Sequence, residues 1–124
     1  MTNISTGKSG EDVAERYLRD LGWKIIERNF KKPWGEIDII AKDPANTLVF
    51  VEVKTMRQSE LLTPEDNMSR AKITKVRRTA SMYAGYSKAL DEEAGWRIDL
   101  IAITIPNNSK EIPRENIRHY ENVL

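Results

Sequence analysis

The sequence predicts one α/β domain, spanning residues 1–124, in which a mixed central sheet is flanked by helices in the order α-β-β-β-α-β. Three observations lead to this class. Two segments repeat apolar residues at three- and four-residue spacing, which is typical of helices. Four runs are rich in β-branched and aromatic residues, which is typical of strands. A length of 124 residues with 40% hydrophobic content is enough for one hydrophobic core.

The first predicted helix starts with Ser9 as its N-cap and an acid, Asp12, three residues on, and it ends at Gly22. Its apolar side is formed by Ala14, Leu18 and Leu21, supported by Tyr17. The second helix is expected over residues 69–86, and one of its sides carries Ile73, Val76, Ala80 and Tyr83. These helices supply the layers that cover the predicted sheet.

Strands are expected over residues 23–30, 35–42, 47–55 and 96–105. Pro33 ends the first run and Pro106 ends the last, because proline cannot donate a ladder hydrogen bond. Residues 56–68 are polar, contain Pro64 and are expected to form a loop. Residues 117–123 are expected to add a short strand at the edge of the sheet.

The composition excludes several classes of protein. There is no cysteine, which excludes a disulfide framework and a thiolate metal site. No apolar run reaches the length of a membrane span, and the first residues lack the hydrophobic core of a signal peptide, so a cytoplasmic protein is expected. The formal net charge is +1, so any contact with nucleic acid requires local segregation of charge.

The second and third strands are predicted to form a hairpin whose register follows from its apolar residues. Alternation gives each strand one apolar face, formed by Ile37, Ile39 and Ala41 in the second strand and by Val49, Val51 and Val53 in the third. Burial of both faces on one side requires Ile37 opposite Val53 and Ile39 opposite Val51. The same register leaves residues 44–46 as the loop, with Asn46 in the left-handed region.

This register brings four charged side chains together on the other face, because it pairs Asp38 with Glu52 and Glu36 with Lys54. Two facing carboxylates destabilise a strand pair by about 1 kcal/mol, and burial raises the pKa of one of them. A bound Mg²⁺ would relieve the repulsion, since hard cations bind carboxylate oxygens. The alternative is a half-solvated hairpin in which Glu36 and Lys54 form an ordinary surface ion pair.

The acid at Asp38, followed by Glu52-Val53-Lys54 on the returning strand, resembles the PD-(D/E)XK signature of restriction-endonuclease-like nucleases. The order α-β-β-β-α-β matches the core of that superfamily. The chain is still more similar to the YraN family of small bacterial proteins, which are predicted relatives of Holliday-junction resolvases. The matching stretches run through nearly the whole chain and comprise Gly10-Glu11 with Ala14, Tyr17-Leu18, Arg28-Asn29-Phe30, residues 35–41, residues 48–55, Lys72 and Arg97-Ile98-Asp99.

The resemblance implies a metal-dependent endonuclease that hydrolyses phosphodiester bonds of structured or branched DNA, with Mg²⁺ or Mn²⁺ as cofactor and a homodimer as the acting form. Asp38 and Glu52 would hold the cation, and Lys54 would orient water or stabilise the transition state. Glu11 on the first helix would complete the site, although an ordinary first-turn acid has the same pattern. The single histidine, His119, is expected to take no part in the chemistry.

The second helix is the expected contact for a polyanion. Between residues 70 and 86 it carries five basic residues and no acid, and Lys72, Lys75 and Arg78 follow one exposed flank. Arg57 is expected to join them if the site opens on that side. A solvated helix face is the alternative for this pattern. Two other functions therefore stay open, a non-catalytic nucleic-acid-binding accessory protein and a structural or protein-interaction domain.

Overall fold

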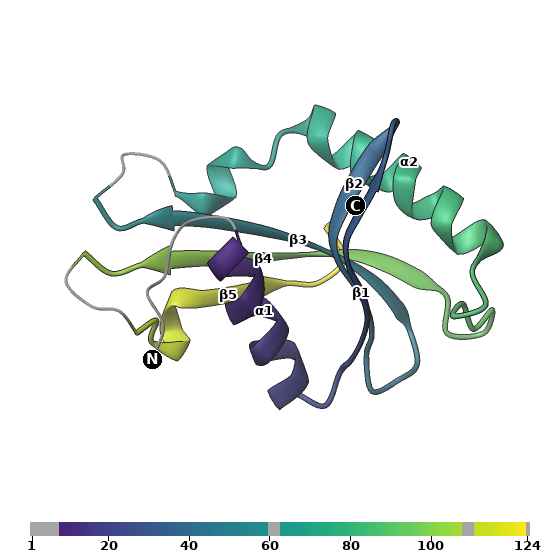
Figure 1. Cartoon of the computed structure of the whole chain (residues 1–124), viewed down its shortest axis with the longest axis horizontal. Coiled ribbons are helices and arrows are strands. Elements are labelled where there is room, and N and C mark those ends of the chain that lie inside the picture. Colours follow the sequence, from purple (N-terminus) through teal and green to yellow (C-terminus); the bar gives the residue numbers. More distant parts are fainter. Residues whose placement is uncertain (1–7, 60–62, 108–110, 124) are drawn as a thin grey trace.

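The computed structural model describes residues 8–59, 63–107 and 111–123, and Figure 1 shows its five-stranded sheet with helices on both sides. In chain order the elements are α1 (Lys8–Asp20), β1 (Lys24–Lys32), β2 (Gly35–Lys42), β3 (Leu48–Arg57), η1 (Pro64–Asn67), α2 (Arg70–Tyr86), β4 (Trp96–Ile105), η2 (Arg114–Asn116) and β5 (Ile117–Tyr120), where η marks a 3-10 helix. The strand order is β1-β2-β3-β4-β5, with β3 and β4 parallel and the other neighbours antiparallel. The predicted α/β class with a mixed sheet is confirmed.

The helix boundaries follow from local hydrogen bonding. Ser69 caps α2, since its hydroxyl oxygen accepts the backbone N–H of Lys72 at 3.3 Å, in agreement with the predicted start of this helix. Helix α1 begins at Lys8, so Ser9 lies inside it and is not its N-cap as predicted. Gly22 follows α1 with a φ of 87°, which confirms it as the stop. Leu21 lies beyond the last helical residue and is exposed, so its predicted place on the apolar side is wrong.

Strands β2 and β4 have their predicted bounds, and β5 forms the predicted edge strand. Strands β1 and β3 run two residues further than predicted, to Lys32 and Arg57. The predicted loop over residues 56–68 therefore starts later and contains η1, while residues 60–62 lie outside the described chain. Asn46 has a φ of 70°, which confirms the left-handed conformation expected for it in the β2–β3 loop.

The sheet carries an apolar layer on each face. The α2 layer contains Phe30, Ile37, Ile40, Leu48, Phe50, Val76, Ala80, Tyr83, Ala84 and Ile98. The α1 layer contains Ala14, Leu18, Trp23, Ile39, Ala41, Val49, Val51, Ile101 and Ile103. Removal of these side chains from water is the main driving force of folding. No helix within the described ranges is both long and apolar enough to cross a membrane.

Ile37 and Ile39 lie on the same strand two residues apart, yet they pack into different layers, so the prediction that they share a face is wrong. The cause lies in the neighbouring strand. Asn29 stands between the residues paired with these isoleucines and has a φ of 53°, and this left-handed residue rotates the hairpin locally. The β1–β2 hairpin consequently crosses toward α2, as Figure 1 shows.

The tip of this hairpin is held against α2 by a close approach that glycine allows. A Cβ atom on Gly35 would overlap the hydroxyl oxygen of Thr79. Thr79 is buried, and its hydroxyl donates a hydrogen bond to the carbonyl of Lys75 at 3.0 Å. Because both partners are fixed, the contact sets the distance between the hairpin and the basic helix.

We expect Gly35→Ala to lower the free energy of unfolding by about 1–3 kcal/mol, because the added methyl group forces Thr79 or the hairpin to move. Chemical denaturation of the purified variants measures this change. Gly85→Ala is the matched control, since a Cβ atom on Gly85 meets no atom within 4 Å and alanine favours the helix by about 1 kcal/mol. The control should be as stable as the wild type or more so, and equal losses in both variants would contradict the close approach.

Candidate active site

The candidate site begins where β2 separates from β3. The two strands keep the predicted register as far as the Ile39–Val51 pair. Beyond this pair the ladder ends, and the Asp38 carboxylate accepts the backbone N–H of Val53 at 2.8 Å. The predicted pairing of Ile37 with Val53 is therefore wrong, because the Val53 N–H is accepted by the Asp38 side chain and not by the main chain of β2. Asp38 consequently lies at the gap between the two separating strands.

Glu52 contacts Asp38 at this gap. The Glu52 side chain is 13% exposed, and its Oε1 lies 3.3 Å from Nζ of Lys54. Burial, the negative charge of Asp38 and a hydrogen bond with Asp38 raise the pKa of Glu52 to about 8, although Lys54 acts in the opposite direction. The structure thus brings Asp38, Glu52 and Lys54 together, and burial together with the Asp38 charge favours the protonated form of Glu52.

Glu11 approaches the same region from the first turn of α1. The preceding residue, Gly10, packs so closely on β3 that a Cβ atom there would overlap the hydroxyl oxygen of Thr55. The Glu11 side chain is 16% exposed, and its Oε1 lies 3.7 Å from the Arg28 guanidinium and has no hydrogen-bond partner. Burial and then the charge of Asp38 raise the pKa of Glu11. The close packing of α1 thus places an unsatisfied carboxyl oxygen near Asp38.

These three acids have the chemistry of a site for a hard divalent cation. Asp38 and Glu52 are in contact, and Glu11 offers a buried oxygen without a hydrogen-bond partner. The carboxyl oxygens of these three acids do not all lie within 4.8 Å of one another. Within the described residues, the group whose ligand atoms lie that close is Asp99, His119 and Glu121. Mg²⁺ and Mn²⁺ commonly keep several water ligands, so the pair of acids would bind directly and Glu11 through water.

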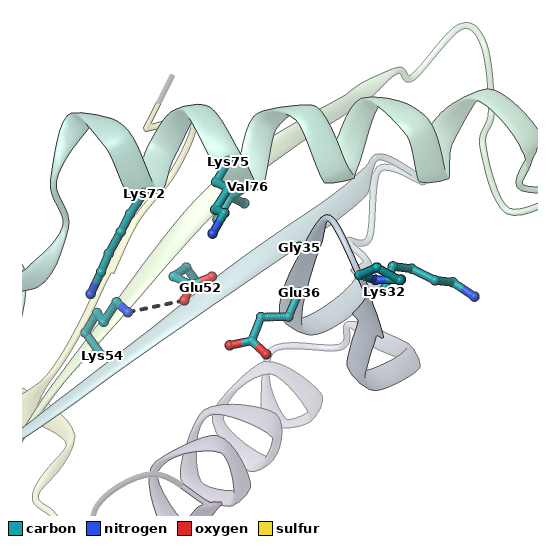
Figure 2. A pocket seen from close by; sticks show the side chains of 9 residues that line it. Lys32, Gly35, Glu36, Glu52, Lys54, Lys72, Lys75 and Val76 are labelled. Atoms are coloured by element: carbon teal, nitrogen blue, oxygen red, sulfur yellow. Dashed lines mark ion pairs between the residues drawn. The ribbon is translucent and has the colours of Figure 1, made fainter.

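A cleft of about 410 Å³ opens beside these residues, between β3, the β1–β2 hairpin and α2 (Figure 2). It is lined by Lys32, Pro33, Gly35, Glu36, Glu52, Lys54, Lys72, Lys75 and Val76. The predicted polyanion contacts Lys72 and Lys75 are exposed here, and Arg78 lies with them along a neighbouring groove on α2. Arg57 is exposed at the end of β3 and is not among the residues that line the cleft. Lys54, Lys72 and Lys75 therefore lie near Glu52, while Lys32 lies on the hairpin (Figure 2).

Glu36 and Lys54 both line the cleft, but their predicted pairing is wrong. In the described chain Lys54 forms its ion pair with Glu52, and Figure 2 shows the Glu36 carboxylate away from Lys54. The reason is again the separation of the strands, because β2 no longer runs beside β3 at this position. Glu36 is exposed at the rim of the cleft.

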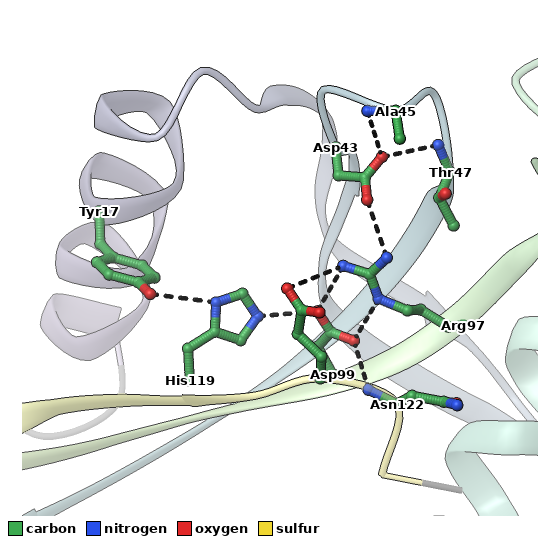
Figure 3. Close-up of polar contacts among 9 residues, drawn as sticks. Tyr17, Asp43, Ala45, Thr47, Arg97, Asp99, His119 and Asn122 are labelled. Carbon is green, nitrogen blue, oxygen red and sulfur yellow. Dashed lines mark hydrogen bonds and ion pairs between the residues drawn. The ribbon is translucent and has the colours of Figure 1, made fainter.

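A second group of ionisable residues lies on β4 and the C-terminal segment (Figure 3). Ligand atoms of Asp99, His119 and Glu121 lie within 4.8 Å of one another, a spacing that would suit a metal. Arg97 already pairs with both acids of this group, because its guanidinium lies 2.9 Å from Asp99 and 3.6 Å from Glu121. A metal ion would have to compete with that guanidinium for both carboxylates, so the group is better explained as a structural ion-pair network.

Asp99 is buried and fully satisfied in this network. His119 Nε2 lies 2.8 Å from one of its oxygens, and the backbone N–H of Asn122 donates to the other at 2.9 Å. Burial acts to raise the pKa of Asp99, but the bonds from His119, Arg97 and Asn122 together hold this pKa below its usual value. The sequence signal for this network is the Arg-x-Asp spacing, because residues two apart in β4 share a face.

We expect the metal-free protein to lose stability as the pH rises, because Glu52 binds its proton more tightly in the folded state. Its pKa is about 8 when folded against 4.5 as the unperturbed value, so the contribution is complete below pH 4.5 and is lost as the pH rises through 8. Glu52→Gln removes this titration. From pH 5 to pH 8.5 its free energy of unfolding should therefore rise, relative to that of the wild type, by on the order of 2–4 kcal/mol.

Chemical denaturation in EDTA across this pH range measures the difference. Glu36→Gln is the matched control, since it removes an exposed acid from the rim of the same cleft. It should follow the wild type at every pH. A Glu52→Gln curve parallel to that of the wild type would show that the buried proton is absent.

Comparison with known proteins reveals similarity along most of the chain. Residues 10–103 match the uncharacterised protein family UPF0102. A UPF0102 protein of Thermodesulfovibrio yellowstonii is 40% identical over 124 residues, which cover 100% of this chain and 99% of the relative. UPF0102 proteins of Persephonella marina and Dictyoglomus thermophilum are 39% and 36% identical, over 95% and 89% of this chain and 91% of each relative. The matched region contains the first three strands, α2 and most of α1 and β4. The chain therefore belongs to the UPF0102 family, as its resemblance to the YraN family predicted.

Proposed function

We propose that this protein is a metal-dependent endonuclease that hydrolyses phosphodiester bonds of structured or branched DNA. The observation that carries the proposal is the contact between Asp38 and Glu52, with Lys54 beside it, at a cleft lined by further lysines. Hydrolysis of a phosphodiester requires a positioned water and compensation for the charge of the transition state. Paired acids that can hold a cation, together with a lysine at hydrogen-bonding distance, supply these requirements.

Each residue has a separate role in this proposal. Asp38 and Glu52 would hold Mg²⁺ or Mn²⁺, and Glu11 would bind a water in its shell. When bound, the cation lowers the pKa of a water ligand and neutralises charge on the phosphate. The Val53 N–H orients Asp38 by fixing one of its oxygens. The ammonium of Lys54 lies 3.3 Å from Glu52, where it would donate to the attacking water or to a phosphate oxygen.

The lysines of α2 would hold the rest of the nucleic acid. Lys72 and Lys75 are exposed on the wall of the cleft opposite the hairpin, and Arg78 extends the positive charge along the helix. Contacts of this kind go to phosphates and position a strand without reading its bases. Shape would therefore guide recognition more than sequence, which is consistent with structured or branched DNA as the substrate.

The alternative function is a nucleic-acid-binding accessory protein of the same fold that cleaves nothing. The basic residues of α2 would serve either function, but the acids distinguish the two. Buried carboxyl groups next to a phosphate weaken binding unless a cation lies between them. The raised pKa of Glu52 and the unsatisfied oxygen of Glu11 therefore favour the nuclease.

We expect millimolar Mn²⁺ or Mg²⁺ to raise the Tm of the wild-type protein by several degrees, because a ligand at about 100 times its Kd stabilises the folded state by about 2.7 kcal/mol. Asp38→Asn should remain folded, because its amide oxygen can still accept the Val53 N–H, and it should lose this response. His119→Gln is the control for the second group, and it should keep the full metal shift even if its own Tm is lower. A wild type that does not respond, or a response lost in His119→Gln instead, would contradict the assignment.

We expect the wild type to cleave at least one substrate in a panel of duplex, flap, four-way and single-stranded DNA when Mg²⁺ is present. Lys54→Ala should slow cleavage by roughly 10²–10³-fold, the range seen when one transition-state donor is removed. Lys88→Ala is the matched control, since it removes an exposed lysine away from the cleft. Equal activity in Lys54→Ala would indicate a contaminating nuclease, and binding without cleavage by the wild type would favour the accessory protein.

A further inference from the structure

The tip of the β1–β2 hairpin carries an exposed tryptophan among cations. Lys31, Lys32, Pro33 and Trp34 are all exposed, and 42% of the surface of Trp34 is open to solvent. The chain has three tryptophans, of which Trp23 is 7% exposed and Trp96 is partly buried. Neither the α1 layer nor the α2 layer includes Trp34. Packing of the core therefore does not account for a tryptophan at this position.

The tip is a fixed platform. Lys32 pairs with Gly35, so Pro33 and Trp34 form the turn, and proline restricts the backbone immediately before the tryptophan. The residue after it, Gly35, is clamped against the buried hydroxyl of Thr79. Trp34 is thus held from both sides at a set distance from α2, and ordering it in a complex would cost little conformational entropy.

The platform borders the cleft that contains the candidate catalytic residues. Both chain neighbours of Trp34, Pro33 and Gly35, line this cleft together with Glu52 and Lys54. Figure 2 shows Gly35 and Lys32 on the hairpin, with Lys75 on the helix that forms the facing wall. A phosphodiester held at Glu52 and Lys54 would therefore have the nucleotides on one side of it beside the tryptophan.

An aromatic ring next to a row of lysines is the surface with which proteins bind unpaired nucleotides, since the ring stacks on a base while the cations contact phosphates. Bases inside a duplex are already stacked on one another and cannot accept the ring without distortion. The lysines also argue against a purely apolar partner, because its approach would remove their charges from water.

We propose that Trp34 stacks on an unpaired base of a nucleic acid whose backbone crosses Lys72 and Lys75. The site would then select substrates in which a duplex gives way to unpaired nucleotides, such as a flap or an open branch point. This inference rests on the proposed function, because it places the scissile phosphate at Glu52 and Lys54.

Binding in EDTA tests the inference without cleavage. The probes are a labelled flap DNA and a blunt duplex of the same length, and the variants are Trp34→Ala, Trp34→Phe and the control Tyr86→Ala. Tyr86 is an exposed aromatic residue at the far end of α2, outside the residues that line the cleft. Because Trp34 is exposed, all variants should melt close to the wild type.

We expect Trp34→Ala to weaken flap binding roughly tenfold and to leave blunt-duplex binding unchanged, while Trp34→Phe keeps most of the affinity for the flap. The flap should also quench tryptophan fluorescence of the wild type and of Tyr86→Ala but not of Trp34→Phe. An equal loss on both probes, or no loss on the flap, would overturn the stacking role.

The outcomes separate this inference from the function beneath it. If the wild type binds and cleaves DNA and Trp34→Ala does the same, the inference fails and the proposed nuclease stands. If the wild type binds neither probe and cleaves none of the substrates, both fail. A change of self-association in Trp34→Ala without a change in DNA binding would assign the tip to protein contact and would also overturn the inference.

Discussion

One hydrogen bond, from the backbone N–H of Val53 to the carboxylate of Asp38, accounts for much of the arrangement around the cleft. A buried N–H in a sheet needs an acceptor, and the main chain of β2 has already turned away at this point. The Asp38 side chain fills that place, so the strands can separate without an unpaired donor. The same separation lets the hairpin cross toward α2 and opens the cleft beside Glu52.

Among the residues that the structure describes, the acids around Glu52 and those around Asp99 differ sharply, and their contrast favours a function for the first group. Asp99 has three partners and a lowered pKa, so its group is stabilised as it stands. Glu52 has a raised pKa, and Glu11 has a buried oxygen without a hydrogen-bond partner. A folded chain bears such a cost where a ligand later compensates it, and perturbed acids at a cleft therefore mark a candidate active site.

Local patterns in the sequence were sufficient to predict the order of the elements and the register near Ile39 and Val51, because alternation and turn chemistry are properties of neighbouring residues. They were insufficient where geometry departs from a regular strand. The left-handed Asn29 sends Ile37 into the other layer, and the separation of β2 gives Lys54 to Glu52 in place of Glu36. The Asp99 network also depends on β5, which returns to β4 from a distant part of the chain.

The unsatisfied state of Glu11 follows from competition for one guanidinium. Arg28 lies 2.7 Å from Asp12, 3.3 Å from Glu15 and 3.7 Å from Glu11, so Asp12 and Glu15 hold it more closely than Glu11 does. A cation held by Asp38 and Glu52, with Glu11 bound to one of its waters, would not have to displace Arg28 from a strong hydrogen bond, since the guanidinium already has partners. The α1 side thus supplies acids with one weakly held member, while α2 supplies lysines across the cleft. The net charge of +1 conceals this local segregation, because α2 carries basic residues without an acid while Glu11, Asp12 and Glu15 of α1 gather around Arg28.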